Sequence, residues 1–248
     1  DNDAAIALSR AHSYLRAATS TPAYCYLLDH TGSLLRRLGH LDAALVTSSL
    51  AITLSLGQSD PSLIARCQLT ASAIFNCFPE KKQMANNLLL QVIRTAPASP
   101  YAYSAAINHA LHQIEIKKPT KALRTLDQLP PESIPTSYKF IFAWTRATAL
   151  KDLCQLEQAT LYYVNALAQA PADPVYLLKA FVELYSLGTL PTRNLVHIFN
   201  EVSPRIQCLA QTKPKVYGQA MELRKSLLRG ESNRCLSPLE GLKTALTD

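Results

Sequence analysis

The sequence is poor in glycine, with 7 Gly among 248 residues against 15 Pro. Tight β-hairpins and phosphate-binding loops both rely on closely placed glycines, so this scarcity disfavours a hairpin-rich β fold and a Gly-rich nucleotide loop. Helices separated by proline-marked corners suit the composition better. The hydrophobic share of 48% and the charged share of 17% also exclude a disordered or collagen-like chain.

The sequence also lacks the residue clusters that catalysis or metal binding requires. It holds no nucleophile elbow, no paired-carboxylate motif and no Cys-x-x-Cys pair. His109, His112 and Glu115 are spaced three apart, so one helical face could present them to a metal ion. No fourth ligand accompanies them, and a core position for His109 is the commoner alternative. We therefore predict a protein that is not an enzyme and that needs no cofactor and no metal.

The six cysteines are separated along the chain, and most have apolar neighbours. This pattern predicts buried, reduced core residues, and hence a reducing compartment: the cytoplasm, with the nucleus as an alternative. The cysteines are Cys25, Cys67, Cys77, Cys154, Cys208 and Cys235.

The net charge of +7 is spread along the chain. Residues 1–100 carry 8 basic and 6 acidic groups, residues 101–200 carry 9 and 7, and residues 201–248 carry 8 and 5. No run of five residues is purely basic, which is more typical of a solvated surface than of a nucleic-acid track.

No hydrophobic segment indicates a signal peptide or a membrane span. The uncharged stretch between Asp42 and Asp60 is seventeen residues long and holds five Ser or Thr before Gly57, too short and too polar to cross a bilayer. The chain begins at Asp1 rather than Met, so we expect it to be a piece of a larger protein.

Helical periodicity extends over nearly the whole chain. Apolar residues recur three or four positions apart in segments that are separated by Pro or Gly, and no segment shows sustained strand alternation. The predicted helices are 4–18, 25–38, 41–56, 63–78, 83–95, 101–116, 119–129, 137–153, 156–170, 174–187 and 191–202. The expected breakers include Pro22, Gly39, Pro61, Pro79, Pro97, Pro100, the 130–135 region, Pro171, Pro174, Gly188, Pro191 and Pro204.

Small residues recur in pairs, twelve positions apart, with one member in each of two consecutive helices. Antiparallel helices approach closely only where their side chains are small, so this spacing predicts helical hairpins. The pairs are Gly32 with Ala44, Ala73 with Ala85, Ala110 with Ala122, and Ala147 with Ala159.

With this spacing, the sequence resembles the tetratricopeptide-repeat (TPR) family. The best match is 140–173, followed by 25–58, 66–99 and 103–136, whereas 174–207 is degenerate because it has Phe181 and Arg193 at the small positions. The resemblance implies an all-α fold: a right-handed α-solenoid of about five TPR-like helix hairpins with terminal capping helices. We expect a partial repeat or cap over 1–24, the repeat array over 25–207, and basic capping helices and a tail over 208–248.

The resemblance further implies that the first helix of each pair lines a concave groove that binds a partner. The residues at these places are largely apolar, which indicates a surface that something covers: a partner helix, an extended peptide or the chain's own C-terminal tail. The acidic-tail clamp of some family members is not matched. The predicted groove residues are Ile74, Ile107, Leu111, Ile114, Trp144, Thr148, Lys151, Val182 and Tyr185.

The C-terminal tail combines basic and apolar residues. A capping amphipathic helix is one interpretation, and contact with an acidic partner or a nucleic acid is another. The basic positions are Lys213, Lys215, Arg224, Lys225 and Arg229. We predict a non-enzymatic interaction scaffold, a subunit of a larger protein or complex. The alternatives are a regulatory TPR module of a transcriptional or signalling protein and a nucleic-acid-contacting helical repeat.

Overall fold

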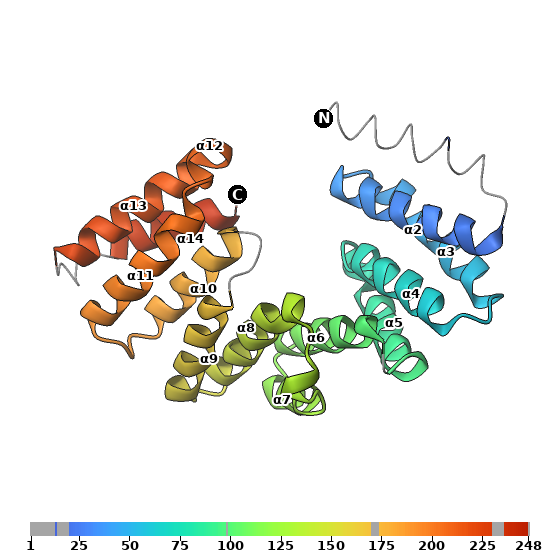
Figure 1. Cartoon of the computed structure of the whole chain (residues 1–248), viewed down its shortest axis with the longest axis horizontal. Coiled ribbons are helices and arrows are strands. Elements are labelled where there is room, and N and C mark those ends of the chain that lie inside the picture. Colours follow the sequence, from blue (N-terminus) through green and yellow to red (C-terminus); the bar gives the residue numbers. More distant parts are fainter. Residues whose placement is uncertain (1–12, 14–19, 98, 170–173, 230–235, 248) are drawn as a thin grey trace. The chain divides into compact units, whose positions relative to one another are not determined.

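A computed structural model describes residues 13, 20–97, 99–169, 174–229 and 236–247. These residues form helices and short connections, and none of them lies in a strand, so the predicted all-α class is confirmed (Figure 1). The predicted helix 4–18 lies outside the described residues, apart from Ser13. The chain divides into two compact units, Asp1–Glu115 (unit 1) and Ile116–Asp248 (unit 2). Their boundary falls inside the predicted array 25–207.

In unit 1, each helix packs against its successor. The first helices of successive pairs are also neighbours, since α2 contacts α4 and α4 contacts α6. One helix pair cannot bury its apolar face alone, so this stacking is what stabilises a repeat. The elements are α2 (Thr21–Arg37), α3 (Leu41–Leu56), α4 (Pro61–Phe75), η1 (Pro79–Lys81), α5 (Lys82–Thr95) and α6 (Pro100–Glu115).

Unit 2 continues the same pattern as far as α11 and ends differently. There α13 packs against α11, and α14 returns to pack against α10 as well as α13. Part of the C-terminal tail therefore contacts α10, the first helix of the fifth pair. The elements are α7 (Pro119–Asp127), η2 (Pro131–Ser133), α8 (Thr136–Asp152), α9 (Leu156–Ala168), α10 (Pro174–Ser186), α11 (Thr192–Ile206), α12 (Leu209–Thr212), α13 (Pro214–Leu228) and α14 (Leu236–Thr247).

Several expected breakers lie at helix starts. Proline occupies the first turn of α2 and α4, as expected, and also that of α7 and α13; there its missing N–H removes no helical hydrogen bond. Asp60 caps α4 by accepting hydrogen bonds from the backbone N–H groups of Ser62 (2.9 Å) and Leu63 (3.3 Å). Pro204 is an exception, because it lies inside α11. The helix continues to Ile206, where burial of Val202 and Ile206 offsets the lost hydrogen bond.

The small-residue pairs lie at buried positions, with one correction. A Cβ on Gly32 would lie 3.6 Å from the carbonyl oxygen of Ala44, which confirms the predicted crossing of α2 and α3. Ala110, Ala122, Ala147 and Ala159 are fully buried. Ala73 is exposed, so the prediction for the second pair is wrong at that residue. The buried small side chain there belongs to Ala71, in one cluster with Ala44 and Ala85.

The corner after the first helix of a pair has a recurring backbone conformation. Among the described residues, φ is positive at Gly39, Lys117, Cys154 and Gly188. Each of the four follows position 32, 110, 147 or 181 by seven residues, so all occupy the same place in the repeat. At Gly39 and Cys154, the next residue donates its N–H to the carbonyl five positions earlier, closing a Schellman motif. The repeat therefore continues into the degenerate fifth pair.

Cys154 adopts this left-handed conformation with a side chain, which costs about 1–2 kcal/mol relative to glycine. We expect Cys154→Gly to raise the free energy of unfolding by about 1 kcal/mol, measured by urea denaturation. Cys77→Gly is the matched control: Cys77 is also exposed but lacks a positive φ, so its replacement should not stabilise. Equal gains from both variants would contradict the assignment.

The cysteines divide into two groups. Cys25 and Cys67 are buried in one cluster with Leu28, and burial raises the pKa of the Cys67 thiol to about 12. Cys77, Cys154 and Cys208 are exposed, so the prediction of a core position is wrong for these three. They lie at helix ends and corners, where apolar sequence neighbours do not imply burial. Cys235 lies outside the described residues.

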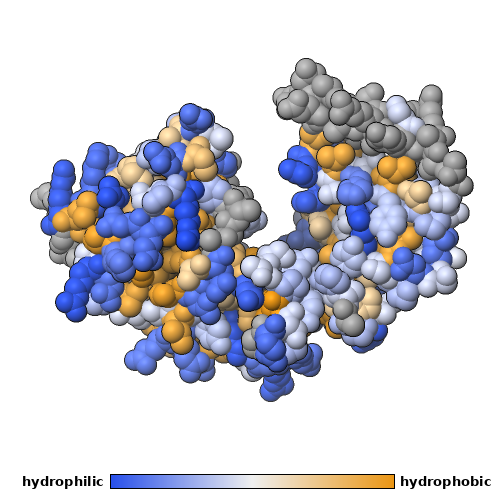
Figure 2. Space-filling view, in the orientation of Figure 1, coloured by the Kyte–Doolittle hydropathy of each residue, from blue (hydrophilic) through white to orange (hydrophobic). Residues whose placement is uncertain are grey.

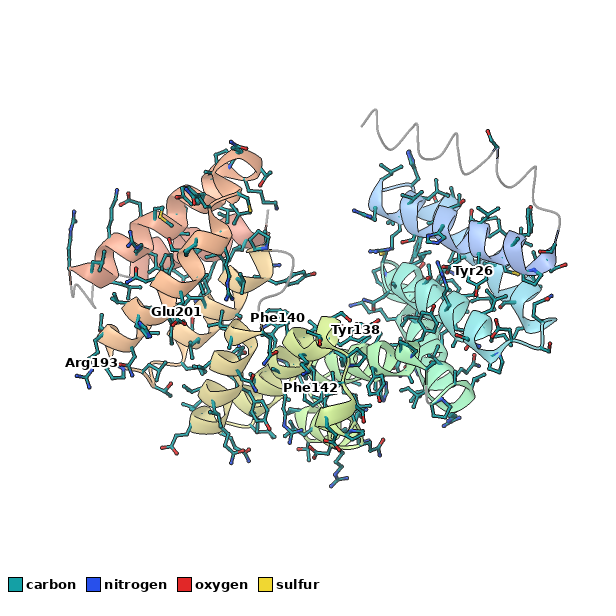
Figure 3. All side chains as sticks on the ribbon, in the orientation of Figure 1. Tyr26, Tyr138, Phe140, Phe142, Arg193 and Glu201 are labelled. Carbon is teal, nitrogen blue, oxygen red and sulfur yellow. The ribbon has the colours of Figure 1, made fainter. Side chains whose placement is uncertain are left out.

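The fifth pair packs without small residues at the crossing. Phe181 on α10 and Phe199 on α11 are fully buried and meet edge to face, with ring centroids 5.0 Å apart. Arg193, the other unexpected residue, is exposed near the start of α11 (Figure 3). An aromatic contact thus replaces the small-residue crossing of the earlier pairs.

Candidate functional site

Three aromatic rings meet on the first helices of unit 2. Phe140 and Trp144 on α8 stack with centroids 6.3 Å apart, and Tyr176 on α10 lies 6.3 Å from Phe140 and 6.2 Å from Trp144. Lys179 Nζ lies 5.9 Å from the Tyr176 centroid. We call Phe140, Trp144, Tyr176 and Lys179 the aromatic face. Figure 2 shows that hydrophobic residues reach the surface of this unit among hydrophilic ones.

The aromatic face is partly open to solvent. Tyr176 is 42% exposed and Trp144 is half-buried, whereas Phe140 is buried beneath them. The indole N–H of Trp144 is buried and has no hydrogen-bond partner, which costs about 1–3 kcal/mol. Contacts with Phe140 and with each other hold the two partly open rings in place.

Next to the aromatic face, an ion pair joins the same two helices. Lys151 Nζ on α8 lies 2.5 Å from Glu183 Oε2 on α10. One turn away, the hydroxyls of Thr148 and Tyr163 share a hydrogen bond of 3.1 Å. Burial raises the pKa of the Tyr163 phenol, which stays protonated. The ion pair connects α8 with α10, and the Thr148–Tyr163 hydrogen bond connects α8 with α9.

The predicted groove residues of unit 2 fall into two groups. Trp144, Thr148, Lys151 and Tyr185 are half-buried, and the first three lie at or beside the aromatic face. Val182 is 4% exposed and belongs to the core, so an accessible groove does not extend to it. The sequence reasoning missed Tyr176, whose place next to Trp144 depends on how α8 and α10 meet.

In unit 1, the predicted apolar groove is mostly interior. Ile74, Ile107 and Ile114 are buried, and Leu111 is half-buried. These three isoleucines are therefore not accessible to a partner in the structure. Ile74, for example, packs in a cluster with Ala44 and Ala71. Their apolar character is explained by the core alone.

A polar cluster on the first helices of unit 1 was not predicted as a unit. Asp29 on α2 is 3% exposed and accepts a 2.8 Å hydrogen bond from Arg66 Nε on α4. Arg66 Nη2 lies 2.7 Å from His30 Nε2, and the guanidinium covers the Tyr26 ring at 4.9 Å. Burial lowers the Arg66 pKa, but the hydrogen bond and charge of Asp29 outweigh it and the pKa is raised. Asp29 Oδ1 is buried without a partner.

His109 lies in the interior, and both of its ring nitrogens have hydrogen-bond partners. Its Nδ1 is 2.5 Å from Asn86 Oδ1, and its Nε2 is 2.8 Å from Gln113 Nε2. A neutral ring with the proton on Nδ1 satisfies both contacts, since it donates to Asn86 and accepts from Gln113. Burial, and secondarily the charge of His112, lowers the His109 pKa. Among the described residues, no group of three or more His, Cys, Asp or Glu is placed to hold a metal.

This histidine predicts a pH dependence of stability. Its folded pKa is lowered below the ordinary 6.5, so on acidification the unfolded chain takes up the proton first. The free energy of unfolding should therefore fall as the pH drops below about 6.5, and His109→Gln should flatten that decline. Urea denaturation between pH 7.5 and 5, in steps of about half a pH unit, measures the free energy of unfolding. The exposed His40→Gln variant is the control and should keep the slope; a slope unchanged by His109→Gln would contradict the assignment.

The basic tail residues are partly engaged within unit 2. Arg224 donates two hydrogen bonds to Asn200 Oδ1 on α11, and Lys225 pairs with Glu222 at 2.7 Å. That contact lowers the pKa of Glu222. Lys213, Lys215 and Arg229 are exposed. On the opposite face of α13, Val216, Ala220, Leu223 and Leu227 are buried. This arrangement suits a packed amphipathic helix better than a nucleic-acid track.

Comparisons with known proteins agree with the fold. No protein-family model and no curated protein matches the sequence. Among solved structures, the chain is similar to "BtubC (BKLC) from P. vanneervenii" with a TM-score of 0.59 and 11% identity, covering 99% of this chain and 90% of that one. The TPR2AB domain of yeast Sti1, in its pHSP90 complex, matches with a TM-score of 0.35 and 10% identity, over 94% and 91% of the two chains. The first likeness shows the fold; the helix pairs resemble tetratricopeptide repeats.

No helix among the described residues has both the length and the apolar character needed to cross a membrane.

Proposed function

We propose that this chain is a protein-interaction module that holds a segment of a partner protein against the aromatic face of unit 2. The observation that carries the proposal is the Phe140–Trp144–Tyr176 cluster, with Tyr176 42% exposed on a helix that is otherwise well packed. Trp and Tyr are enriched among the few residues that carry most of the binding energy at protein interfaces.

The chemistry of the face indicates the kind of segment it takes. The rings offer flat apolar area, and Lys179 places a positive charge over the edge of that area. A helix or extended peptide with a leucine or aromatic residue beside a carboxylate complements both features. Because the ion pair Lys151–Glu183 holds α8 and α10 together, the face is preorganised and binding costs little ordering.

Trp144 makes the proposal directly testable, because it is the only tryptophan in the chain. Peptides selected against the protein from a random display library should change Trp144 fluorescence on binding. We expect Tyr176→Ala to weaken that binding at least about 10-fold, and Lys179→Glu to weaken it for peptides that carry a carboxylate.

Tyr26→Ala is the matched control, because Tyr26 is an aromatic of similar exposure in unit 1. It should leave peptide affinity unchanged. Peptides that bind without changing Trp144 emission, and equally well to the Tyr176→Ala variant, would overturn the proposal. The predicted roles as a regulatory module or complex subunit, and the predicted compartment, stay predictions.

A further inference from the structure

Unit 2 contains a second site, a half-open cavity of about 450 Å³ between α7, α8 and α9. It exists because α7 is short: it ends at Asp127 after 9 residues, whereas α9 has 13. Beyond Asp127 the chain turns through η2 instead of continuing as a helix. The space beside the second half of α9 is therefore left open, with Tyr162, Asn165 and Gln169 along it.

Arg146 on α8 lines this cavity and is only partly engaged by neighbouring side chains. Its Nη1 lies 2.7 Å from Asp127 Oδ1, and its guanidinium lies 5.1 Å from the centroid of the Tyr162 ring. Its Nε is buried and has no hydrogen-bond partner. The ion pair thus occupies one end of the guanidinium and leaves the Nε edge unpaired. An arginine can bind a carboxylate along this edge with two parallel hydrogen bonds.

The charges around the cavity match a single negative charge. Lys139 lines it without a salt bridge to any described residue, so Lys139 and Arg146 together outweigh Asp127 by one positive charge. A monoanion balances this excess, whereas Asp127 repels a phosphate dianion more strongly. The amides of Asn165 and Gln169, joined by a 3.1 Å hydrogen bond, add polar partners on the α9 side.

We infer that the cavity is a binding site for a carboxylate group, held by the Nε edge of Arg146 with Lys139 beside it. The site does not rest on the proposed function. Phe142 lines the cavity, while Phe140, two residues earlier, belongs to the aromatic face, and two residues turn a helix by about 200° (Figure 3). The same helix therefore presents two separate surfaces.

The test uses small probes and a resonance specific to the site. Glutamate blocked as N-acetyl α-amide is titrated into the full chain, and the Nε–Hε signal of Arg146 is followed by NMR. We expect a downfield Hε shift that saturates in the millimolar range, as is typical of a single charged contact at a partly open site. The glutamine analogue, which lacks the charge, should give no shift, and inorganic phosphate should bind more weakly.

Variants separate this site from a merely structural ion pair. Because lysine cannot offer two parallel donors, we expect Arg146→Lys to weaken probe binding about 10-fold or more. Asp127→Asn removes the competing negative charge and should tighten probe binding about 3-fold or more. If the Arg146–Asp127 ion pair served only to stabilise the fold, Asp127→Asn would not tighten probe binding. Arg124→Gln, an exposed arginine of α7 that does not line the cavity, is the control and should change nothing.

Two further probes, a capped Ala-Ala-Glu-Ala-Ala peptide and succinate, identify the source of the carboxylate. Tighter binding of the peptide indicates that the natural ligand is an acidic segment of a polypeptide. Tighter binding of succinate indicates a small dicarboxylate. Either result supports the site. The inference is overturned if Arg146 Hε does not respond to blocked glutamate, if the glutamine analogue shifts it equally, or if Arg124→Gln weakens binding as much as Arg146→Lys.

Discussion

Replacing Arg66 with Met is expected to lower the free energy of unfolding by about 3–5 kcal/mol, because it leaves a buried carboxylate without its counter-charge. Asp29 is 3% exposed, and its Oδ2 accepts the 2.8 Å hydrogen bond from Arg66 while its Oδ1 already lacks a partner. No other cation forms a salt bridge with Asp29 among the described residues. Urea denaturation followed by circular dichroism measures the loss.

A second variant distinguishes loss of charge balance from loss of packing. In the double variant Asp29→Asn with Arg66→Met, no buried charge remains, and we expect most of the stability to return. Arg37→Met is the control, since Arg37 is an exposed arginine on α2, and its effect should stay within about 0.5 kcal/mol. A cost below about 1 kcal/mol for Arg66→Met would show that Asp29 gains little from this pair.

Gly32 is expected to tolerate replacement by alanine but not by a larger residue. A Cβ at this position would lie 3.5 Å from Ile74 Cδ1 and 3.6 Å from both the Ala44 carbonyl oxygen and the Ser48 nitrogen, which are ordinary contact distances. Gly32→Ala should therefore stabilise by about 0.5–1 kcal/mol, because Gly in a helix interior is entropically unfavourable. Gly32→Leu should destabilise by about 3 kcal/mol, because its further atoms must displace the backbone of α3.

The control for this pair of variants is Gly218, near which a Cβ would meet no atom within 4 Å. It also lies within a helix, α13, so Gly218→Ala and Gly218→Leu should both stabilise modestly. Thermal unfolding of the four variants separates backbone entropy from crowding. If Gly32→Leu were tolerated as well as Gly218→Leu, close approach of α2 and α3 would not be what Gly32 provides.

The candidate sites could be predicted only in part. Trp144 is recognisable as a large residue on a first helix, but Tyr176 joins it only through the packing of α8 against α10. Ile74, Ile107 and Val182 have the spacing of groove residues and are nevertheless buried, because periodicity locates a helical face without saying which neighbour covers it. The Arg146 cavity depends on where α7 stops, and that end carries no distinctive signal in the sequence.

Local sequence determined the helices, their corners and some of the hairpin crossings. Apolar periodicity, first-turn prolines, and small residues twelve apart act within a few turns of chain, where side-chain size and backbone geometry dominate. The tertiary structure decided which charges were buried, which rings stayed exposed and where a cavity remained. Those outcomes depend on contacts between residues far apart in the chain, such as Asp29 with Arg66 and Phe140 with Tyr176, whose geometry follows from how whole helices stack.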